Sequence, residues 1–539
     1  MATTIITQGS STLYSMNLST GTATTLTLPT DVTLSTTRKP RFAILNQWIV
    51  MVNSPSKNLA IDPEGTVRVL VPRPPTHPPL AAAGSSTGLT GAYQYKVSFI
   101  VQNSDGELLM ESPLGPASIS ITASNTDLSL TDIAPSLDTI SARRLYRTLA
   151  GGEAYFHIVD IDGNSLTSYL DANLDATVKL LPSVPGTLVS SPGTLPGIRF
   201  KNIIEWKSRL WAVADDPTLI DTVFVSDTNK VYAWPHQVTA YPTGMDADGI
   251  VAFGKRRNQL GLLKTNGVWQ IGGSASSTGI STDNISVSQV EVGSGCVAPD
   301  SVVTVNDAVY YLGADGVYKW DDSGVTSISD SNVAPWFRTD TYFNRARFPN
   351  AFAKYNELRD QYELHLANTG DSTENRWVAY SIKTGGWYGP HLTSLFTPTH
   401  AANADDADGL PLVLVGGSDG VIYQGNQTTF RDGAATAIAI DAYGPWHGND
   451  APDIDHYWGQ LSMITQVESA GTLTVTPTVG WLNSSAGAAI SHTLTTGREK
   501  LRRLGTGKLC RLRLQHSTVN QGVSVYGWEI EPVHELGRR

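Results

Sequence analysis

Short apolar runs separated by turn residues recur along the chain, and residues 301–322 (SVVTVNDAVYYLGADGVYKWDD) show the pattern most clearly. Three runs in this segment are typical of short strands: Val302–Val305, Ala308–Leu312 and Val317–Trp320. The pairs Asn306-Asp307 and Asp315-Gly316 separate them and favour tight turns, because Gly adopts a positive φ at little cost. The segment therefore predicts a three-stranded antiparallel meander, the unit from which a propeller blade is built.

Comparable units begin near Pro40, Asn202, Gly249 and Ala351, and another ends at Asn426. The N-terminal STLYSMNLSTGTATTLTLP predicts a further hairpin. Successive turns are separated by unequal lengths of chain, which indicates blades with loop insertions and not a strict WD or kelch repeat. We expect six or seven blades.

Two proline-rich stretches interrupt this pattern. Pro72–Pro79 (PRPPTHPP) is typical of a stiff extended linker, and LPSVPGTLVSSPGTLPG begins at Leu181. Between them apolar and polar residues alternate over several strands, in which Tyr93, Tyr95, Val97 and Phe99 share one face. The length of this span suits a β-sandwich inserted between blades. Long alternating runs near the C-terminus predict a second, separate sandwich.

The predicted fold is therefore all-β: an irregular β-propeller of six or seven blades, an inserted β-sandwich and a C-terminal β-sandwich. The expected parts are an N-terminal propeller portion at 1–75, the inserted sandwich at 76–182, the main propeller at 183–430 and the C-terminal sandwich at 431–539.

Composition supports short strands joined by turns, since only 16% of the residues are charged against roughly 25% in an average globular protein. The net charge of −11 makes the chain a poor generic binder of nucleic acid. Cys296 and Cys510 form no metal-ligand pair with a neighbour. The start MATTIITQGSS lacks the features of a signal peptide, and no window approaches the ~20 consecutive apolar residues of a membrane span. We expect a soluble protein made in the cytoplasm.

Two G-x-S-x-G strings, Gly84–Gly88 and Gly416–Gly420, are the only nucleophile motifs of this kind, but a hydrolase places the serine between a strand and a helix. We predict a loop and a turn instead. The run HGNDAPDIDH carries possible metal ligands in His447, Asp450, Asp453, Asp455 and His456, without a recognised spacing.

Asn403–Gly409 (NADDADG) resembles the start of a calcium loop, but the distal glutamate is missing. Exposed loops are favoured for both acidic segments. We therefore predict no catalytic residue, no metal site, no cofactor and no enzyme activity.

Tryptophans follow several of the predicted turns. The segment SDTNKVYAW at Ser226 only partly matches the sialidase Asp-box, which is itself a structural motif. Each Trp offers a large area to bury and one N–H to satisfy. We therefore predict packing roles for Trp234, Trp269, Trp320 and Trp387.

Basic residues concentrate near the C-terminus of this acidic chain, in GREKLRRLGTGKLCRLRL and in the final Arg pair. They form a candidate assembly interface, the basic edge of the C-terminal sandwich. Its members are Arg498, Lys500, Arg502, Arg503, Arg511, Arg513, Arg538 and Arg539.

Three segments resemble tail proteins of short-tailed bacteriophages: FKNIIEWKSRLWAVADDPTLIDTVFVSDTNKVYAWP, the GCVAPDSV stretch that precedes DGVYKW, and the C-terminal EPVHELGRR. The inserted RRLYRTLAGGEAYFHIVDI resembles the fibronectin-like insertions of the same proteins. The resemblance is to the tail-nozzle family, also called tail tubular protein B, and to the related packaged-DNA stabilisation hubs.

This resemblance implies a virion structural protein that forms a six-fold ring below the portal and adaptor, retains packaged DNA and conducts it during ejection. The implied partners are further copies of the chain, the portal-adaptor ring, tail fibre, spike or needle proteins, and genomic DNA that passes without sequence-specific binding. The implied location is the virion tail, after synthesis in the host cytoplasm.

Two other classes of function stay open. A glycan-binding or depolymerising tail protein on a propeller predicts exposed Trp beside paired carboxylates. A bacterial surface or scaffold propeller predicts a monomer. Fold-level analogy does not separate them.

Overall fold

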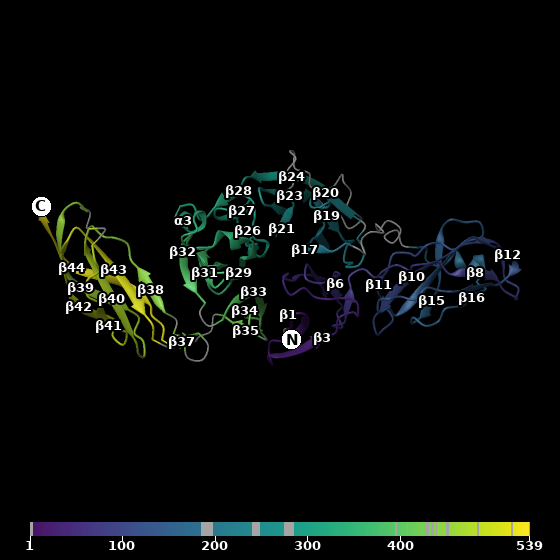
Figure 1. Ribbon diagram of the computed structural model, residues 1–539, viewed down its shortest axis with the longest axis horizontal. Helices are drawn as coiled ribbons and strands as arrows, with labels where there is room; N and C mark the ends of the chain where they lie inside the picture. Colours follow the sequence, from purple (N-terminus) through teal and green to yellow (C-terminus); the bar gives the residue numbers. More distant parts are fainter. Residues whose placement is uncertain are drawn as a thin grey trace. The chain divides into compact units, whose positions relative to one another are not determined.

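The computed structural model is built almost entirely of small antiparallel sheets, which confirms the predicted all-β class (Figure 1). The chain divides into a larger unit, Met1–Thr393 with Thr397–Tyr423, and a smaller unit, Ser394–Phe396 with Gln424–Arg539. The structure describes residues 4–184, 198–234, 236–239, 248–273, 285–331, 333–393, 396–406, 408–425, 431–432, 436–437, 439–448, 452–481, 484–518 and 521–537. Among these, no helix is long and apolar enough to cross a membrane.

Seven sheets of the larger unit are simple meanders, in which each strand pairs with the next along the chain. The first three are β1(Thr4–Gly9), β2(Thr12–Asn17) and β3(Thr22–Leu26); β4(Arg41–Leu45), β5(Trp48–Val52), β6(Leu59–Ile61) and β7(Val67–Val69); and β17(Phe200–Trp206), β18(Arg209–Ala214), β19(Thr222–Val225) and β20(His236–Thr239). The next two are β21(Ile250–Lys255), β22(Leu260–Lys264), β23(Gly267–Gly273) and β24(Ile285–Val292); and β25(Val303–Val305), β26(Ala308–Leu312), β27(Val317–Asp321) and β28(Gly324–Ser327). The last two are β29(Phe352–Asn356), β30(Gln361–Leu366), β31(Arg376–Ser381) and β32(Trp387–Leu392); and β33(Pro398–Asp405), β34(Pro411–Gly417) and β35(Ile422–Gln424).

The first strands of successive sheets lie against one another. Strand β4 contacts β17, β17 contacts β21, β21 contacts β25, β25 contacts β29, and β29 contacts β33. Short helices occupy connections between these sheets: η2(Pro299–Ser301) precedes β25, while α3(Ala334–Arg338) and η3(Arg345–Asn350) precede β29. The chain therefore brings the beginnings of six sheets together although they are far apart in the sequence.

Apolar cores fill the spaces between neighbouring sheets. One core joins Trp206 and Trp211 to Trp269 of the next sheet, and another joins Leu263 to Trp320 of the sheet after that. Trp234, Trp269 and Trp320 are all buried. Trp387 is half-buried, donates its indole N–H to the Ile328 carbonyl at 2.9 Å and packs against Phe337. The predicted packing roles are confirmed.

The three strands predicted within residues 301–322 form as β25, β26 and β27, and β28 adds a fourth strand. Asn306 and Asp307 both take positive φ, as a tight hairpin turn requires. The prediction was wrong about Gly316, which does not take a positive φ. A Cβ at Gly316 would instead lie 2.4 Å from Ser329 Oγ, so the glycine permits a close approach of the chain.

The inserted segment contains three further sheets around its own core. Their strands are β8(Leu80–Ala83), β9(Leu89–Tyr93), β10(Tyr95–Gln102), β11(Leu108–Glu111), β12(Ile121–Thr126), β13(Leu128–Thr131), β14(Ala142–Thr148), β15(Tyr155–Asp162) and β16(Tyr169–Asp171), followed by α1(Asp175–Val178). Tyr93, Tyr95 and Val97 enter this core, and Phe99 is also buried. All four predicted residues are therefore buried, but they do not share one strand: Tyr93 ends β9, whereas Tyr95, Val97 and Phe99 lie on β10 in another sheet.

Neither G-x-S-x-G string lies between a strand and a helix. Gly84–Gly88 connects β8 to β9, and Gly416–Gly420 runs from the end of β34 into the turn before β35. The predicted loop and the predicted turn are confirmed.

In the described part of the smaller unit, two of the three sheets enclose one core. One sheet has the order β38(Ile440–Tyr443), β43(Leu509–His516), β40(Thr472–Gly480) and β41(Ile490–Thr493). The other has the order β42(Arg498–Gly507), β39(Asp455–Thr465) and β44(Val525–Gly537). A two-stranded sheet of β36(Arg431–Asp432) and β37(Thr436–Ala437) precedes them.

Candidate functional sites

The predicted basic interface begins on β42, an edge strand that pairs only with β39. The register shifts near Ser462, so that β42 carries one more residue than its partner between Lys500 and Arg503. Such a bulge breaks strict alternation. Leu501 and Leu504 accordingly pack toward the core, while four basic residues remain exposed: Arg498, Lys500, Arg502 and Arg503.

Two of these four residues are engaged within the unit. Arg498 pairs with Glu529 at 2.5 Å, and Arg502 donates to the Ala488 carbonyl at 2.8 Å. Lys500 and Arg503 make no side-chain hydrogen bond or ion pair with any residue that the structure describes. Their charges therefore stay available on an exposed sheet edge.

Arg511 and Arg513 lie in the other sheet, on β43, so the structure divides the predicted interface into two groups. Cys510 and Leu512 point into the core, and alternation places the two arginines on the opposite face. Arg513 forms a bidentate pair with Asp441 at 2.8 and 2.5 Å, which lowers the pKa of Asp441. Arg538 and Arg539 lie outside the described residues.

Aromatic residues that the sequence analysis did not select accompany this second group. The Arg511 guanidinium lies 4.9 Å from the ring centre of Tyr443 and 4.6 Å from that of Trp446. Tyr443 and Trp481 are 56% and 52% exposed. Strand pairing places Tyr443 beside Arg513, since the two residues are partners across β38 and β43.

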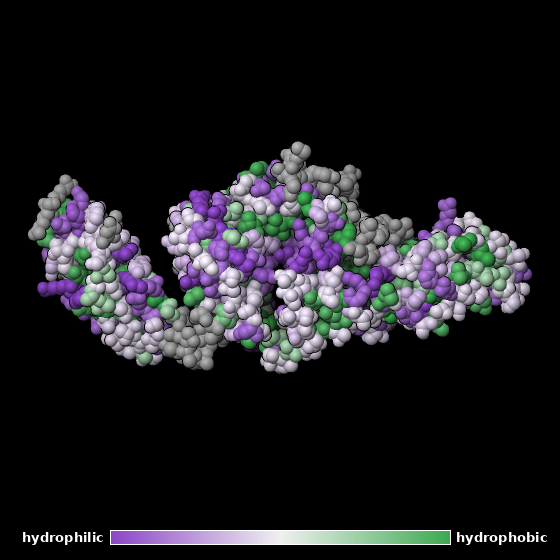
Figure 2. All heavy atoms as spheres, viewed as in Figure 1, coloured by the Kyte–Doolittle hydropathy of each residue, from purple (hydrophilic) through white to green (hydrophobic). Residues whose placement is uncertain are grey.

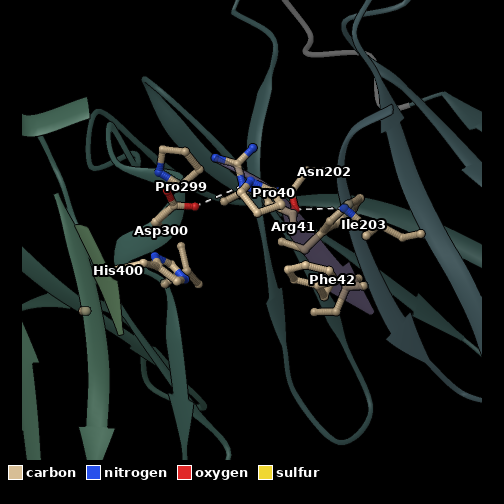
Figure 3. Close-up of a pocket in the computed structure, with 13 residues that line it drawn as sticks. Pro40, Arg41, Phe42, Asn202, Ile203, Pro299, Asp300 and His400 are labelled. Carbon is tan, nitrogen blue, oxygen red and sulfur yellow. Dashed lines mark hydrogen bonds and ion pairs between the residues drawn. The ribbon is translucent and has the colours of Figure 1, made fainter. Parts of the chain in front are cut away.

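A second candidate site is a cavity of about 320 Å³ in the larger unit (Figure 3). Residues at or just before the first strands of six sheets line it: Pro40, Arg41, Phe42, Asn202, Ile203, Ile204, Ala252, Phe253, Pro299, Asp300, Val302, Ala353 and His400. No motif marked it in the sequence, because its charged residues come from distant positions.

Three charged or titratable side chains dominate the cavity. Arg41 donates from Nε to Asp300 Oδ1 at 3.0 Å and from Nη1 to the Lys201 carbonyl at 2.6 Å. Figure 3 shows the Asp300 carboxylate directed toward Arg41, with the His400 ring beside Asp300. The His400 side chain borders the cavity and is exposed to solvent.

Lys39 adds a further positive charge next to this group. Its ammonium donates to the Asn350 carbonyl at 3.0 Å and lies 3.9 Å from Asp300. This bond joins the segment before β4 to the segment before β29, which are 311 residues apart.

Burial and neighbouring charges together shift the pKa values of Asp300, Lys39 and His400. Burial raises the pKa of Asp300, but Arg41, His400 and Lys39 outweigh this effect and hold that pKa below its ordinary value. Burial lowers the pKa of Lys39 and of His400, and in both cases Arg41 acts in the same direction. The positive charges near the cavity are therefore only partly compensated.

The described residues of the two acidic segments are not arranged as a group of metal ligands. Among the described residues, no group of three or more His, Cys, Asp or Glu side chains is arranged to hold an ion. Asp450 lies outside those residues, while His456 is buried within β39 beside Trp458. The Asn403–Gly409 segment ends β33 and turns, with Asp406 accepting backbone N–H groups of Asp408 and Leu410.

No protein-family model matches the chain, and no curated protein matches it. Solved structures give weak likenesses. The extracellular domain of the BT4673 hybrid two-component system from B. thetaiotaomicron is 11% identical, covers 93% of this chain and 69% of that chain, and has a TM-score of 0.29. Citrobacter koseri AztD is 8% identical, covers 61% of this chain and 92% of that chain, and has a TM-score of 0.24. At such scores neither likeness carries an argument about function.

Proposed function

We propose that the chain is a structural protein of a bacteriophage tail, which forms a nozzle or hub ring below the portal-adaptor, retains packaged DNA and conducts it during ejection. The sequence resemblance to tail-nozzle proteins is the starting point. The exposed basic edge strand β42 is the structural observation that carries the proposal. A protein that assembles with others needs charged or hydrogen-bonding groups that its own fold does not pair.

The arrangement of sheets in the larger unit supports an irregular β-propeller of six or seven blades. Six of the seven meanders, from the β4 sheet to the β33 sheet, have first strands that lie side by side in chain order, and these six strands or the residues just before them line one cavity. The bond from Lys39 to Asn350 connects the beginning of this series with its later part, as a ring of blades requires. The remaining sheets suit an inserted fibronectin-like sandwich and a C-terminal sandwich.

Strand β42 suits contact with an acidic partner. An edge strand leaves backbone N–H and C=O groups unpaired along one side, and proteins commonly protect such edges with charge. Here Lys500 and Arg503 have no ion pair among the described residues. On a chain with a net charge of −11, a neighbouring copy or another tail ring provides acidic surface for them.

The overall charge suits a DNA channel. Six copies of the chain carry a net charge of −66. A negative wall repels phosphate and avoids the tight, salt-dependent contacts that basic residues make with DNA. DNA would thus pass along the bore without being held by it.

Electron microscopy of purified particles and native mass spectrometry of the purified chain test this proposal. We expect a six-fold ring coaxial with a portal. A stable monomer, or a chain absent from the particle, contradicts it.

One observation favours a second candidate, a glycan-binding tail protein. Tyr443 and Trp481 are exposed on the smaller unit, and aromatic rings of this kind can stack on sugars. In the larger unit, however, Trp234, Trp269 and Trp320 are buried and offer no platform. Binding of host polysaccharide that is lost in Trp481→Ala, together with a monomeric state, would favour this candidate.

A further inference from the structure

We propose that the cavity lined by Arg41, Asp300 and His400 binds a small free oxyanion, of which inorganic phosphate is the simplest example. This site lies among the first strands of the larger unit, whereas the basic strand β42 belongs to the smaller unit, and it does not depend on ring assembly. It goes beyond the tail function because it gives a single chain a ligand of its own.

The donors for such a ligand are present and unused. Arg41 commits Nε to Asp300 and Nη1 to the Lys201 carbonyl, but its Nη2 donates to no residue that the structure describes. The ring nitrogens of His400 likewise form no hydrogen bond within the described part of the chain, and the ring lies 5.7 Å from the ring of Phe352, measured between centres. A guanidinium and an imidazole facing one cavity match the oxygens of phosphate.

The charge at the cavity also favours an anion. Lys39 and Arg41 share the single carboxylate of Asp300, at 3.9 and 3.0 Å. One positive charge therefore has no carboxylate of its own. Hydrogen phosphate supplies acceptor oxygens for Arg41 and His400, together with a hydroxyl that Asp300 can accept.

Charged residues around Lys39, Arg41 and Asp300 do not cancel the surplus positive charge of these three groups. Arg347 is paired with Glu374 at 2.8 Å. Asp215 is paired with both Arg38 and Arg199. The surroundings thus add at least as much positive as negative charge.

The size and walls of the cavity limit the ligand to a small one. A volume of about 320 Å³ lies at the lower end of the range for small-molecule sites. Pro40, Phe42 and Ile203 form apolar walls, near which charge interactions strengthen. The cavity therefore suits a free ion or a small phosphorylated compound, and not a phosphate within a nucleic-acid chain.

Calorimetric titration with sodium phosphate, combined with NMR of ¹³C-labelled histidine, tests the proposal. We expect saturable binding and a rise in the pKa of His400 on adding phosphate, because an anion favours the imidazolium form. His400→Gln and Arg41→Gln should each weaken binding about tenfold or more, since each replaces a group that carries or can take up a positive charge with a neutral amide. His77→Gln, which alters a histidine outside the cavity, should bind as the unaltered chain does.

Two further titrations test whether the cavity binds a neutral sugar or a nucleic-acid chain instead of a free oxyanion. Glucose should not bind, and a single-stranded oligonucleotide without terminal phosphate should not displace phosphate. If Arg41→Gln fails to fold because Asp300 loses its partner, His400→Gln still decides the matter, since His400 forms no hydrogen bond to a described residue. No effect of phosphate on His400, equal binding by His400→Gln, or displacement by the oligonucleotide would overturn the proposal.

Discussion

A Cβ atom on Gly261 would lie 2.4 Å from Cζ3 of Trp320, so the bare backbone of β22 forms the surface on which the tryptophan of the next sheet packs. Arg256 covers the same ring at 5.2 Å. The two sheets therefore approach only because position 261 has no side chain.

We expect Gly261→Ala to lower the free energy of unfolding by about 1–3 kcal/mol, because a methyl group must displace a buried indole. Gly386→Ala is the matched control: its Cβ would meet only Thr384 Oγ1, at 3.5 Å, and stability should change by less than about 0.5 kcal/mol. Urea unfolding followed by tryptophan fluorescence measures both. Equal stability of the two variants would show that the sheets can separate without cost.

A buried ion pair inside the inserted segment provides a second prediction. Arg147 and Asp171 meet at 2.7 Å with both side chains fully buried, and Tyr95 also donates to Asp171 at 2.8 Å. Asp171→Ala should destabilise the segment by about 3–5 kcal/mol, since it removes the buried carboxylate that Arg147 and Tyr95 share and leaves Arg147 with the partly exposed Asp175 as its remaining ion-pair partner.

The exposed pair of Arg513 and Asp441 is the control for this effect. Asp441→Ala should cost no more than about 1 kcal/mol, because water solvates the charges of an exposed pair. Chemical denaturation of both variants, monitored by circular dichroism, gives the comparison. A small loss in Asp171→Ala would mean that water or Asp175 takes over the role of the carboxylate.

The pH dependence of stability should reflect His365. This ring stacks on Phe352 at 4.6 Å, and neither nitrogen has a hydrogen-bond partner among the described residues. Burial, with Lys354 and other cations nearby, lowers the pKa of His365 well below 6.5. Below about pH 6.5, His365 therefore binds a proton in the unfolded chain but not in the folded chain. The free energy of unfolding consequently falls as the pH drops.

His365→Phe removes this contribution while keeping the stacked ring. Between pH 7.5 and pH 5.0, the variant should lose up to about 2 kcal/mol less stability than the unaltered chain. His391 and His400, whose pKa values are also lowered, keep part of the dependence in the variant. Urea unfolding midpoints at the two pH values measure the difference. The same change of midpoint between pH 7.5 and pH 5.0 in both chains would refute the role of His365.

Ring assembly should depend on the two unpaired cations of β42. Lys500→Gln combined with Arg503→Gln should weaken assembly and reduce its sensitivity to salt, because screening acts on the charges that are removed. Arg498→Gln is the control, since Arg498 already forms an ion pair with Glu529 and its charge is not available to a partner. Size-exclusion chromatography at low and high salt measures this, and normal rings from the double variant would exclude β42 as the interface.

Local patterns predicted much of the fold. Alternation located β26 and β27 and the burial of Tyr95 and Val97 on β10, because strand periodicity is visible within a few residues, but it did not show that Tyr93 belongs to the separate strand β9. The same reasoning missed the bulge of β42, which depends on the partner strand. It also missed the cavity, because Arg41 and Asp300 are 259 residues apart and only the order of the sheets brings them together.

The shared lining of the cavity has a consequence for folding. Six of the described sheets contribute, from Pro40 to His400, so loss of any one of them opens the space to bulk water. A ligand held there would be bound only after the last of these sheets has formed. Its release would accordingly report damage to any of the six sheets that line the cavity.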